Sequence, residues 1–405
     1  MSKPDQAIVS NDNAFRITPP PGHCPQAQSL SNTNSNLCAQ EPPSRAFRTT
    51  SCAEKDIVVQ TLVDKGIDAE ALDADYGSAL AAAAFEGEQE LTLTLLEHSS
   101  TTARSSSHLA KALHAATLRG HHDVVRTLLD HGAEANAEGG LYGTALQTAA
   151  LRAHEEVARL LLDRGADANA QGGHYGNALQ AASFAGREGI VRLLLEGGAD
   201  ANAQGGRYGN ALHAAAFEGH EGVLRALLDG GAEVEAPGPD GVTALQAAAF
   251  SANGNVVRIL LEKGANVNAP AGRCGSALQA ASYGGDEDVV QMLFDRHAEF
   301  DARLGDYGKA LHAAAYNGHR KVVQMLLDHE TQGVDGHERH RCYNRALQAA
   351  LFRGHRSVAQ LLLDGGANLN AEGGMFGTSL EAALSGGHED LVRMLIDRGA
   401  DDSTK

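Results

Sequence analysis

Leucine residues recur along this chain at an almost constant interval, and that interval restricts the possible folds more than any other feature of the sequence. The interval is 33 residues at every step except the step from Leu311 to Leu347, which is 36 residues. The ten leucines are Leu80, Leu113, Leu146, Leu179, Leu212, Leu245, Leu278, Leu311, Leu347 and Leu380. A period of this length predicts stacked copies of one small unit, because a single unit cannot bury its own apolar face.

Residues 175–206 contain one such unit and indicate how it folds. Small residues around Leu179 predict a short first helix that allows close packing, and Gly186 ends it. The apolar run 190–195 predicts a second helix with a broad buried face. The polar, glycine-rich segment 200–206 predicts a turn, which we call the finger. The expected fold class is therefore an all-α solenoid of helix–turn–helix repeats joined by β-hairpin or turn fingers.

These units resemble the ankyrin repeat. They share its start (x-A-L-[HQ]-x-A-A), its middle (G-H-x-x-V-V-x-L-L-L) and its end (G-A-D-x-N-A), over about residues 76–401. Where the family has proline before the leucine, this chain has alanine or, in the last repeat, Ser379. Most repeats also carry an aromatic residue followed by glycine, as in Tyr142 and Gly143. The variant Y-G-N-A-L-Q-A-A is similar to the ankyrin arrays of filamentous fungi.

The sequence divides into a tail, a half-repeat and the repeat array. Residues 1–53 hold seven of the ten prolines and have no apolar period, which predicts a disordered tail. That tail either has no selected role or serves as a docking or phosphorylation segment. Residues 54–71 match a second helix without its first, which predicts an N-terminal capping half-repeat. Residues 72–405 hold the ten repeats, with a three-residue insertion near 329–342.

Two segments interrupt the regular pattern of the fingers. Residues 99–107 are rich in serine and predict a flexible finger, with a phosphorylation switch as the alternative. The insertion contains His337, His340 and Cys342, which are possible metal ligands. A structural zinc site needs four ligands in a defined geometry, and no second cluster flanks this one. We therefore expect a solvated loop at 329–342 and no metal site.

The starts and the end of the array give local predictions about stability. The residue two positions before the repeated leucine is Ser, Thr or Asn in seven repeats, but it is Lys111, Lys309 and Arg345 in the second, eighth and ninth. We expect those three first helices to lack a side-chain N-cap, at a cost of ~1 kcal/mol each, and these repeats to be locally weak. The tenth repeat ends without a polar cap, so we expect its apolar face to be only partly covered.

Composition restricts the classes of partner. The formal net charge is −18, which disfavours direct binding to nucleic acid or to anionic lipid. The five cysteines include no CxxC pair, which is typical of a reduced, intracellular protein. The start of the sequence has no signal-peptide pattern, and no apolar run reaches the ~20 residues of a membrane span. We expect an intracellular monomer in the nucleus, the cytoplasm or both.

The sequence contains no arrangement of residues that predicts catalysis. It has no P-loop, and its His-Glu pairs lack the second histidine of a zinc-protease motif. Nine of the nineteen histidines fall at two repeat positions, and the resemblance implies that both positions are structural. We therefore expect no catalytic residue, no cofactor and no metal.

The resemblance implies that a partner protein contacts the finger tips and the exposed part of the first helices, along the concave side of the array. Five residues after most of the repeated leucines lies an aromatic residue, and the next position and the finger tips vary between repeats. The candidate partner-binding residues are Phe184, Phe217, Phe250, Tyr283, Tyr316, Phe352, Arg119, Arg152, Arg353, His174, Arg207 and Arg273. Aromatic side chains anchor interfaces but also fill gaps between repeats, so packing on the adjacent repeat is the alternative. For a second aromatic series at the finger bases, which includes Tyr175 and Tyr208, we expect the structural role.

Three classes of function remain open. The first is a non-enzymatic scaffold that binds another protein; the resemblance implies a regulatory adaptor, such as a transcription coregulator that acts through a DNA-binding factor. The second is the ligand-sensing ankyrin module of a nucleotide-driven, immune-type receptor of fungi, here without the ATPase part. The third is an enzyme, which the absence of converging reactive groups disfavours.

Overall fold

The computed structural model describes residues 73–98, 105–139, 142–269, 275–298, 306–329, 336–373 and 376–400. The predicted tail (1–53) and capping half-repeat (54–71) lie outside these residues. The described residues form two compact bodies that meet in the sequence at Val267 and Asn268, with Asp240–Val242 grouped with the second. We call them the N-terminal body, with repeats 1 to 6, and the C-terminal body, with repeats 7 to 10.

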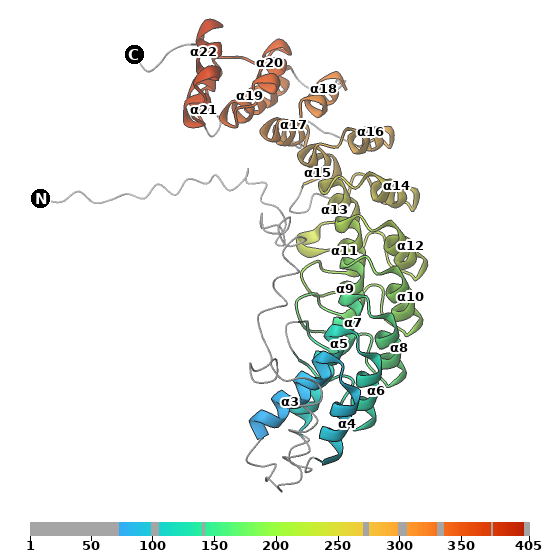
Figure 1. The fold of residues 1–405 in the computed structure, drawn as a ribbon. Helices are drawn as coiled ribbons and strands as arrows, with labels where there is room; N and C mark the ends of the chain where they lie inside the picture. Colours follow the sequence, from blue (N-terminus) through green and yellow to red (C-terminus); the bar gives the residue numbers. More distant parts are fainter. Residues whose placement is uncertain are drawn as a thin grey trace, which may run out of the picture. The chain divides into compact units, whose positions relative to one another are not determined.

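Helices account for nearly all of the regular structure in both bodies, and they come in pairs (Figure 1). The pairs of the N-terminal body are α3 (Asp73–Glu86) with α4 (Gln89–His98), α5 (Ser106–Arg119) with α6 (His122–Asp130), α7 (Ala145–Arg152) with α8 (Glu155–Asp163), α9 (Ala178–Phe184) with α10 (Glu188–Glu196), α11 (Ala211–Glu218) with α12 (Glu221–Asp229), and α13 (Ala244–Phe250) with α14 (Gly254–Glu262). The pairs of the C-terminal body are α15 (Ala277–Gly284) with α16 (Glu287–Asp295), α17 (Asp306–Asn317) with α18 (Arg320–Asp328), α19 (Gly336–Phe352) with α20 (Arg356–Asp364), and α21 (Ser379–Ser385) with α22 (Glu389–Asp397).

Where the structure describes the fingers between the pairs, they contain turns rather than strands. A short 3-10 helix, η3 (Pro239–Gly241), lies in one finger. The only β pairing among the described residues is a set of isolated bridges at finger bases, such as that between Gly172 and Gly176. The predicted all-α solenoid fold is confirmed.

Within the N-terminal body, first helices pack on first helices and second helices on second helices (Figure 1). The small residues of the repeat lie where neighbouring first helices meet: Ala181 and Ala182 are at most 1% exposed, as is Leu179. Because alanine has no side chain beyond Cβ, the helices can approach closely. None of the helices that the structure describes has the length and apolar character needed to cross a bilayer.

The Y-G-N-A-L-Q motif forms a polar clamp between successive repeats. Asn177 is the N-cap of α9: its Oδ1 accepts from Gln180 N at 2.8 Å, and Gln180 Oε1 accepts from Asn177 N at 3.2 Å. Gln180 Nε2 also donates to the carbonyls of Ala203 and Gly209 in the next finger, both at 3.0 Å. A Cβ at Gly176, where φ is +94°, would lie against Gln180 Oε1. The glycine of the motif is therefore required by the buried amide that follows it.

A second link between repeats pairs a histidine with a glycine. His220 lies 3.0 Å through Nε2 from the carbonyl of Phe184, at the end of the preceding first helix. Its ring covers Gly186, where an added Cβ would lie 2.8 Å from ring atoms. In repeat 3, Ala153 takes the place of this glycine, at φ +68°. The residue of repeat 4 that takes the place of the histidine is Arg187. The alanine therefore occurs where no histidine ring occupies the space.

The expectation of a missing side-chain N-cap is wrong for the second repeat, whereas the residues that precede the first helices of the eighth and ninth repeats lie outside the described residues. Helix α5 begins at Ser106, and Ser105 caps it by accepting from His108 N at 3.3 Å, so Lys111 lies inside the helix. Helices α17 and α19 likewise begin before Lys309 and Arg345. In these three repeats the backbone continues as helix toward the N-terminus, as it also does in α3 despite Ser78 at the usual cap position, and the amides that need partners move with it.

The same extension corrects two loop predictions. Residues 105–107, at the end of the serine-rich segment, form the cap and first residues of α5, whereas 99–104 lie outside the described residues. In the insertion, residues 336–342 belong to α19, and Cys342 is 6% exposed. The structure shows no metal-binding group of three or more His, Cys, Asp or Glu side chains in the ranges that it describes.

The last repeat exposes large apolar side chains. Leu384 on α21 and Ile396 on α22 are each 49% exposed. Interior repeats bury the corresponding surface against the next repeat, and the described residues contain no further repeat after α22. The expected partly covered face is therefore present.

Replacing Gln180 with alanine is expected to lower the free energy of unfolding by about 2 kcal/mol, because it removes one side of the helix cap and the side-chain donor of the partly buried Ala203 carbonyl, while Gly209 O keeps its bond from Gly205 N. The measurement is urea denaturation followed by circular dichroism. Gln204→Ala is the control, because its exposed amide donates only to Asn202 O at 3.3 Å. Equal losses from the two substitutions would contradict the clamp.

Gly186→Ala is expected to destabilise the chain by about 2 kcal/mol or more, because it places a methyl group against the His220 ring in a left-handed backbone. The double variant Gly186→Ala with His220→Arg copies the natural pair Ala153 and Arg187. Its destabilisation should be smaller than the sum of the two single effects by about 1 kcal/mol. Additive effects in urea denaturation would show that glycine and histidine are independent.

Candidate functional site

A row of aromatic rings follows the first helices of repeats 4 and 5. Tyr175 and Phe184 have ring centroids 4.9 Å apart, Phe184 and Tyr208 5.3 Å, and Tyr208 and Phe217 6.0 Å. All four side chains are partly exposed. We call these four residues the aromatic column. The two aromatic series of the sequence thus interleave, and each ring packs between neighbours while one part stays accessible.

The histidine links hold this column in place. The carbonyl of Phe184 is the atom that His220 contacts, and Asn253 Nδ2 donates to the carbonyl of Phe217 at 2.7 Å in the same way. The main-chain carbonyls of Phe184 and Phe217 are therefore each hydrogen-bonded to a side chain of the following repeat. The structural role that the resemblance implies for these histidines agrees with this geometry.

The polar groups of the column keep their protons at neutral pH. Tyr208 donates its hydroxyl to Glu218 Oε1 at 3.2 Å. Burial raises the pKa of the Tyr175 hydroxyl to about 12 and raises that of Tyr208 still further. Burial also raises the pKa of the Glu218 carboxyl, against the opposing effects of the Tyr208 hydroxyl and Arg207. The column therefore presents protonated hydroxyl groups beside one carboxyl that is already engaged.

Arginines stack on aromatic rings along the same face. Arg119 Cζ lies 5.0 Å from the centroid of the Phe85 ring, and Arg152 and Arg207 lie 5.9 Å from those of Tyr142 and Tyr208. Such cation–π contacts hold a guanidinium in place without neutralising it. We use the name first-helix face for the aromatic column together with Arg119, Arg152 and Arg207.

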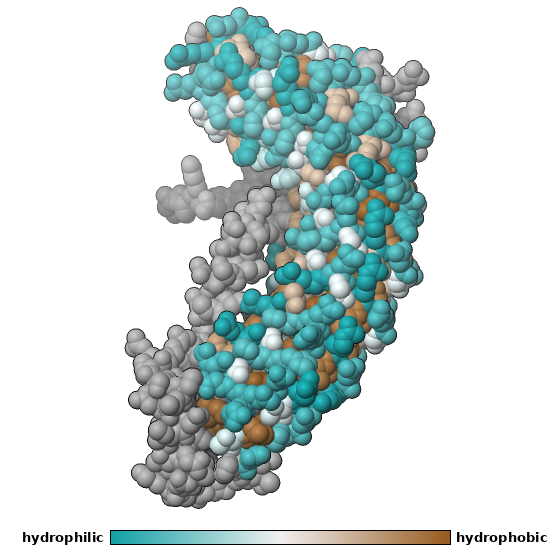
Figure 2. All heavy atoms as spheres, turned by 45° about the vertical axis from the view of Figure 1, so that its right-hand side comes forward, coloured by the Kyte–Doolittle hydropathy of each residue, from teal (hydrophilic) through white to brown (hydrophobic). Residues whose placement is uncertain are grey.

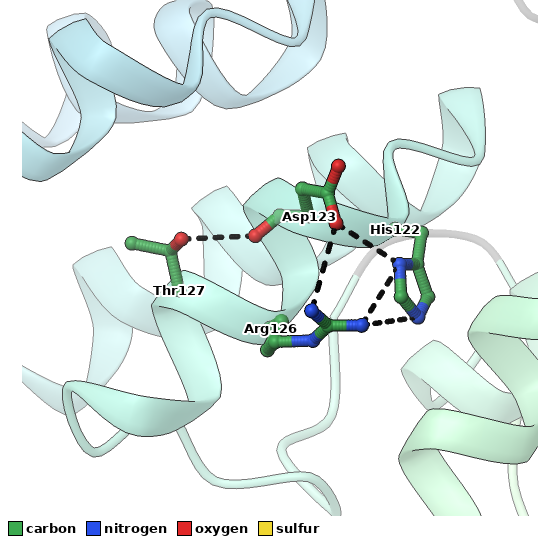
Figure 3. Close-up of polar contacts among 4 residues, drawn as sticks. All are labelled: His122, Asp123, Arg126 and Thr127. Atoms are coloured by element: carbon green, nitrogen blue, oxygen red, sulfur yellow. Dashed lines mark hydrogen bonds and ion pairs between the residues drawn. The ribbon is translucent and has the colours of Figure 1, made fainter.

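Cations on the second helices are arranged differently. On α6, Arg126 lies 3.9 Å from Asp123 Oδ1 and within 3.4 Å of both His122 ring nitrogens, while Thr127 donates to the Asp123 carbonyl (Figure 3). Arg192 pairs with Glu188 at 2.9 Å in the same manner on α10. The surface over the second helices of the N-terminal body is mostly hydrophilic (Figure 2). These pairs are exposed, so each adds at most about 1 kcal/mol of stability.

The structure brings together some of the predicted site residues and separates others. Arg152, His174, Phe184, Arg207 and Phe217 lie along the column, with the His174 ring 5.0 Å from that of Tyr175, and Arg119 lies two repeats before Phe184. Phe250 ends α13 and is partly exposed. Arg273 lies outside the described residues.

The remaining candidates belong to the C-terminal body, which is described by itself. Tyr283 accepts at its carbonyl from His319 at 3.0 Å. Arg353 Cζ lies 4.8 Å from the Tyr316 ring, and Phe352 stacks on Phe376 with centroids 4.4 Å apart. The stacking of arginine on an aromatic ring therefore occurs in both bodies.

The candidate residues from the sequence did not include Tyr175, Tyr208 or Glu218, which the structure places at the aromatic column. The two tyrosines were expected to be structural, and they do pack between repeats, but they also contribute to the accessible row of rings. The available signal was the presence of a finger-base tyrosine and a helix-end phenylalanine in the same two repeats. Glu218 occupies the repeat position that is Arg119 in repeat 2 and Arg152 in repeat 3. The change from a positive to a negative side chain could therefore be seen in the sequence.

Acidification is expected to destabilise the array. Burial is the main cause that lowers the pKa of His220 in the folded chain, and the same direction holds for His114, His154, His312 and His355. As pH falls below the ordinary histidine pKa of about 6.5, the unfolded chain binds protons that the folded chain does not, so the free energy of unfolding decreases. The stability is present above that pH and is lost as pH falls toward the lowered values.

His220→Asn tests this linkage, because repeat 6 carries Asn253 at the same position and still donates to the preceding carbonyl. The variant should show a smaller loss of melting temperature between pH 7.5 and pH 5.5 than the parent chain. At pH 7.5 the two melting temperatures should be close. Equal losses on acidification would exclude His220 as a contributor.

Comparison with known families agrees with the architecture. The model for ankyrin repeats (3 copies) matches residues 49–139, 138–205, 180–271 and 272–339, and the model for a single ankyrin repeat matches residues 343–373. No curated protein matches the chain. The matched segments cover most of the sequence and include every helix pair described above except α21 and α22. This chain belongs to the ankyrin-repeat family.

Proposed function

We propose that this protein is a non-enzymatic regulatory adaptor that binds a partner protein through the first-helix face. Ankyrin repeats are protein–protein interaction modules, so the class of activity follows from the family. The observation that supports this face is the partly exposed aromatic column beside ring-stacked arginines, on main chain that neighbouring repeats hold fixed. Preorganised aromatic and arginine side chains are the residue types that dominate the energetics of protein interfaces.

The regulatory role that we propose is that of a transcription coregulator. A chain with a net charge of −18 is poorly suited to bind DNA, so a DNA-binding partner would provide the contact with the genome. In this proposal the protein acts as a monomer inside the cell, in the nucleus or by moving between nucleus and cytoplasm. The support is the charge of the chain and the interaction class of its repeats.

Affinity capture from the source cell tests the proposal with the full chain and a pair of matched variants. Phe217→Leu removes an accessible ring and keeps an apolar side chain, whereas Arg225→Ala changes an exposed residue on the second helix of the same repeat. A DNA-binding factor should be captured by the parent and by Arg225→Ala, and be reduced several-fold with Phe217→Leu. Identical captures would exclude this face. A lost partner without any link to transcription would exclude the coregulator role alone.

A further inference from the structure

We infer that the C-terminal body binds a small molecule that carries both a carboxylate and an ammonium group, such as a free amino acid, in a cavity beside α19. This inference goes beyond the proposed function, because none of the residues involved belongs to the first-helix face. It is carried by a glutamine side-chain oxygen that accepts a hydrogen bond in four other repeats but finds no donor among the described residues in repeat 9.

The cavity has a volume of about 300 Å³ and lies within the C-terminal body. Its lining consists of Arg341, Asn344, Arg345 and Gln348 on α19 and residues 371–373 of the finger that leads into α21. The four α19 residues share one helix face, because they are spaced by three or four residues. Helices α19 and α21 pack on each other (Figure 1). The volume is at the lower end of the range of ligand pockets and suits a molecule as small as an amino acid.

Repeat 9 departs from the clamp motif at two residues beside this cavity. At the glycine position of the motif, which is Gly176 in repeat 4, repeat 9 has Asn344. At the cap position, which is Asn177 in repeat 4, it has Arg345. A Cβ at the glycine position would lie against the glutamine oxygen of the clamp, and arginine has no acceptor for a helix cap. Neither residue can take its place in the clamp, and helix α19 continues through both positions.

The continuing helix removes the usual partner of the Gln348 oxygen. Gln348 Nε2 donates forward to the carbonyls of Gly373 and Gly377 at 3.0 and 3.1 Å, as in the clamp. Inside a helix, however, the backbone amide at the cap position donates to the carbonyl four residues earlier and not to the glutamine. Every other glutamine at this repeat position has an Oε1 that accepts from that amide, namely those of Gln147, Gln180, Gln246 and Gln279.

The Gln348 oxygen is therefore an acceptor that a ligand can satisfy. The side chain is only 4% exposed, and its Oε1 accepts no hydrogen bond in the described part of the chain. Because the Nε2 end of the amide is fixed by two carbonyls, the oxygen end stays directed away from them, and Gln348 lines the cavity. A buried acceptor without a donor is costly, so a ligand N–H at this point is favoured.

The other polar groups of the cavity carry charges of both signs. Arg341 and Arg345 give the α19 side positive charge, and guanidinium groups bind carboxylates well. Asn344 Oδ1 accepts from Asn368 N at 2.7 Å, whereas Asn344 Nδ2 donates to no described residue. On the finger, Glu372 is exposed and forms no ion pair within the described ranges. The cavity thus offers donors and positive charge on the helix, and acceptors at Gln348 and Glu372.

A molecule with a carboxylate and an ammonium group matches both sets of groups. Its carboxylate faces the two arginines and accepts from Asn344, and its ammonium group donates to Gln348 Oε1 and to Glu372. An anion without an N–H leaves the Gln348 oxygen unsatisfied, and a cation without a carboxylate is repelled by the guanidinium groups. Free amino acids are small molecules that carry both groups.

Thermal unfolding and titration calorimetry with the full chain test the inference. The probes are the twenty standard L-amino acids, each at about 5 mM, and we expect at least one to raise the melting temperature, because a ligand that binds only the folded chain stabilises it. The best binder is then compared by calorimetry with its des-amino form, its decarboxylated form and its N-acetylated form. Each of these should bind at least about tenfold more weakly than the amino acid, since each lacks one charged group.

Substitutions in repeat 9 locate the site. The double variant Asn344→Gly with Arg345→Asn restores the glycine and cap residue of repeat 4, so the Gln348 oxygen should again accept from the backbone. Binding should then fall at least about tenfold, while the melting temperature of the free chain stays the same or rises. Glu372→Gln should reduce the preference for the amino acid over its des-amino form. Arg393→Gln is the control, because Arg393 is exposed on α22 and does not line the cavity.

Four results would each overturn the inference: no amino acid raises the melting temperature, the des-amino form binds as tightly as the amino acid, the folded double variant keeps its affinity, or Arg393→Gln weakens binding as much as the double variant. Equal binding of the N-acetylated form would show that the cavity takes the C-terminus of a protein chain, and the assignment of a free amino acid would be wrong. The capture experiment with Phe217→Leu is independent of all these outcomes, so the proposed function stands or fails separately.

Discussion

A buried glutamine amide links repeats 3, 4 and 9 to the finger that follows each of them. Gln180 caps its own helix through Asn177 and, with the other end of the same group, donates to two carbonyls of the following finger. In the same way, Gln147 and Gln348 each donate to a glycine carbonyl in the finger that follows their own repeat. A buried amide of this kind is costly unless every hydrogen bond is made, so the position of one repeat determines where the next finger can lie. The helix pairs and the first-helix face both depend on that arrangement.

The histidine links connect neighbouring repeats in the opposite direction. Whereas the glutamine reaches forward to the next finger, the histidine reaches back to the end of the preceding first helix. The residue at that end is the column phenylalanine or its equivalent in another repeat. Side chains that are available to a partner are thus attached to main chain that is fixed by its neighbours, which limits the conformational entropy that binding must overcome.

Most of the fold could be predicted from the period of 33 residues and from the glycines that end the helices, because both follow from local backbone preferences. The starts of α5, α17 and α19 could not, since the absence of a capping residue at Lys111, Lys309 or Arg345 does not reveal how far the helix continues. The two aromatic series could be recognised in the sequence, but their joining into one column depends on the geometry of the finger. Sequence spacing within a repeat does not determine that geometry.

The pairing of glycine with histidine across neighbouring repeats also restricts how such an array can grow. Repeat 3 carries Ala153 followed by His154, so a tandem duplication of this repeat would set the histidine of the second copy against the alanine methyl of the first. Repeat 4, with Gly186 and Arg187, is compatible with either kind of neighbour. The repeats are therefore not interchangeable modules. The presence or absence of a Cβ at the glycine position restricts the order in which repeats can be copied, lost or recombined.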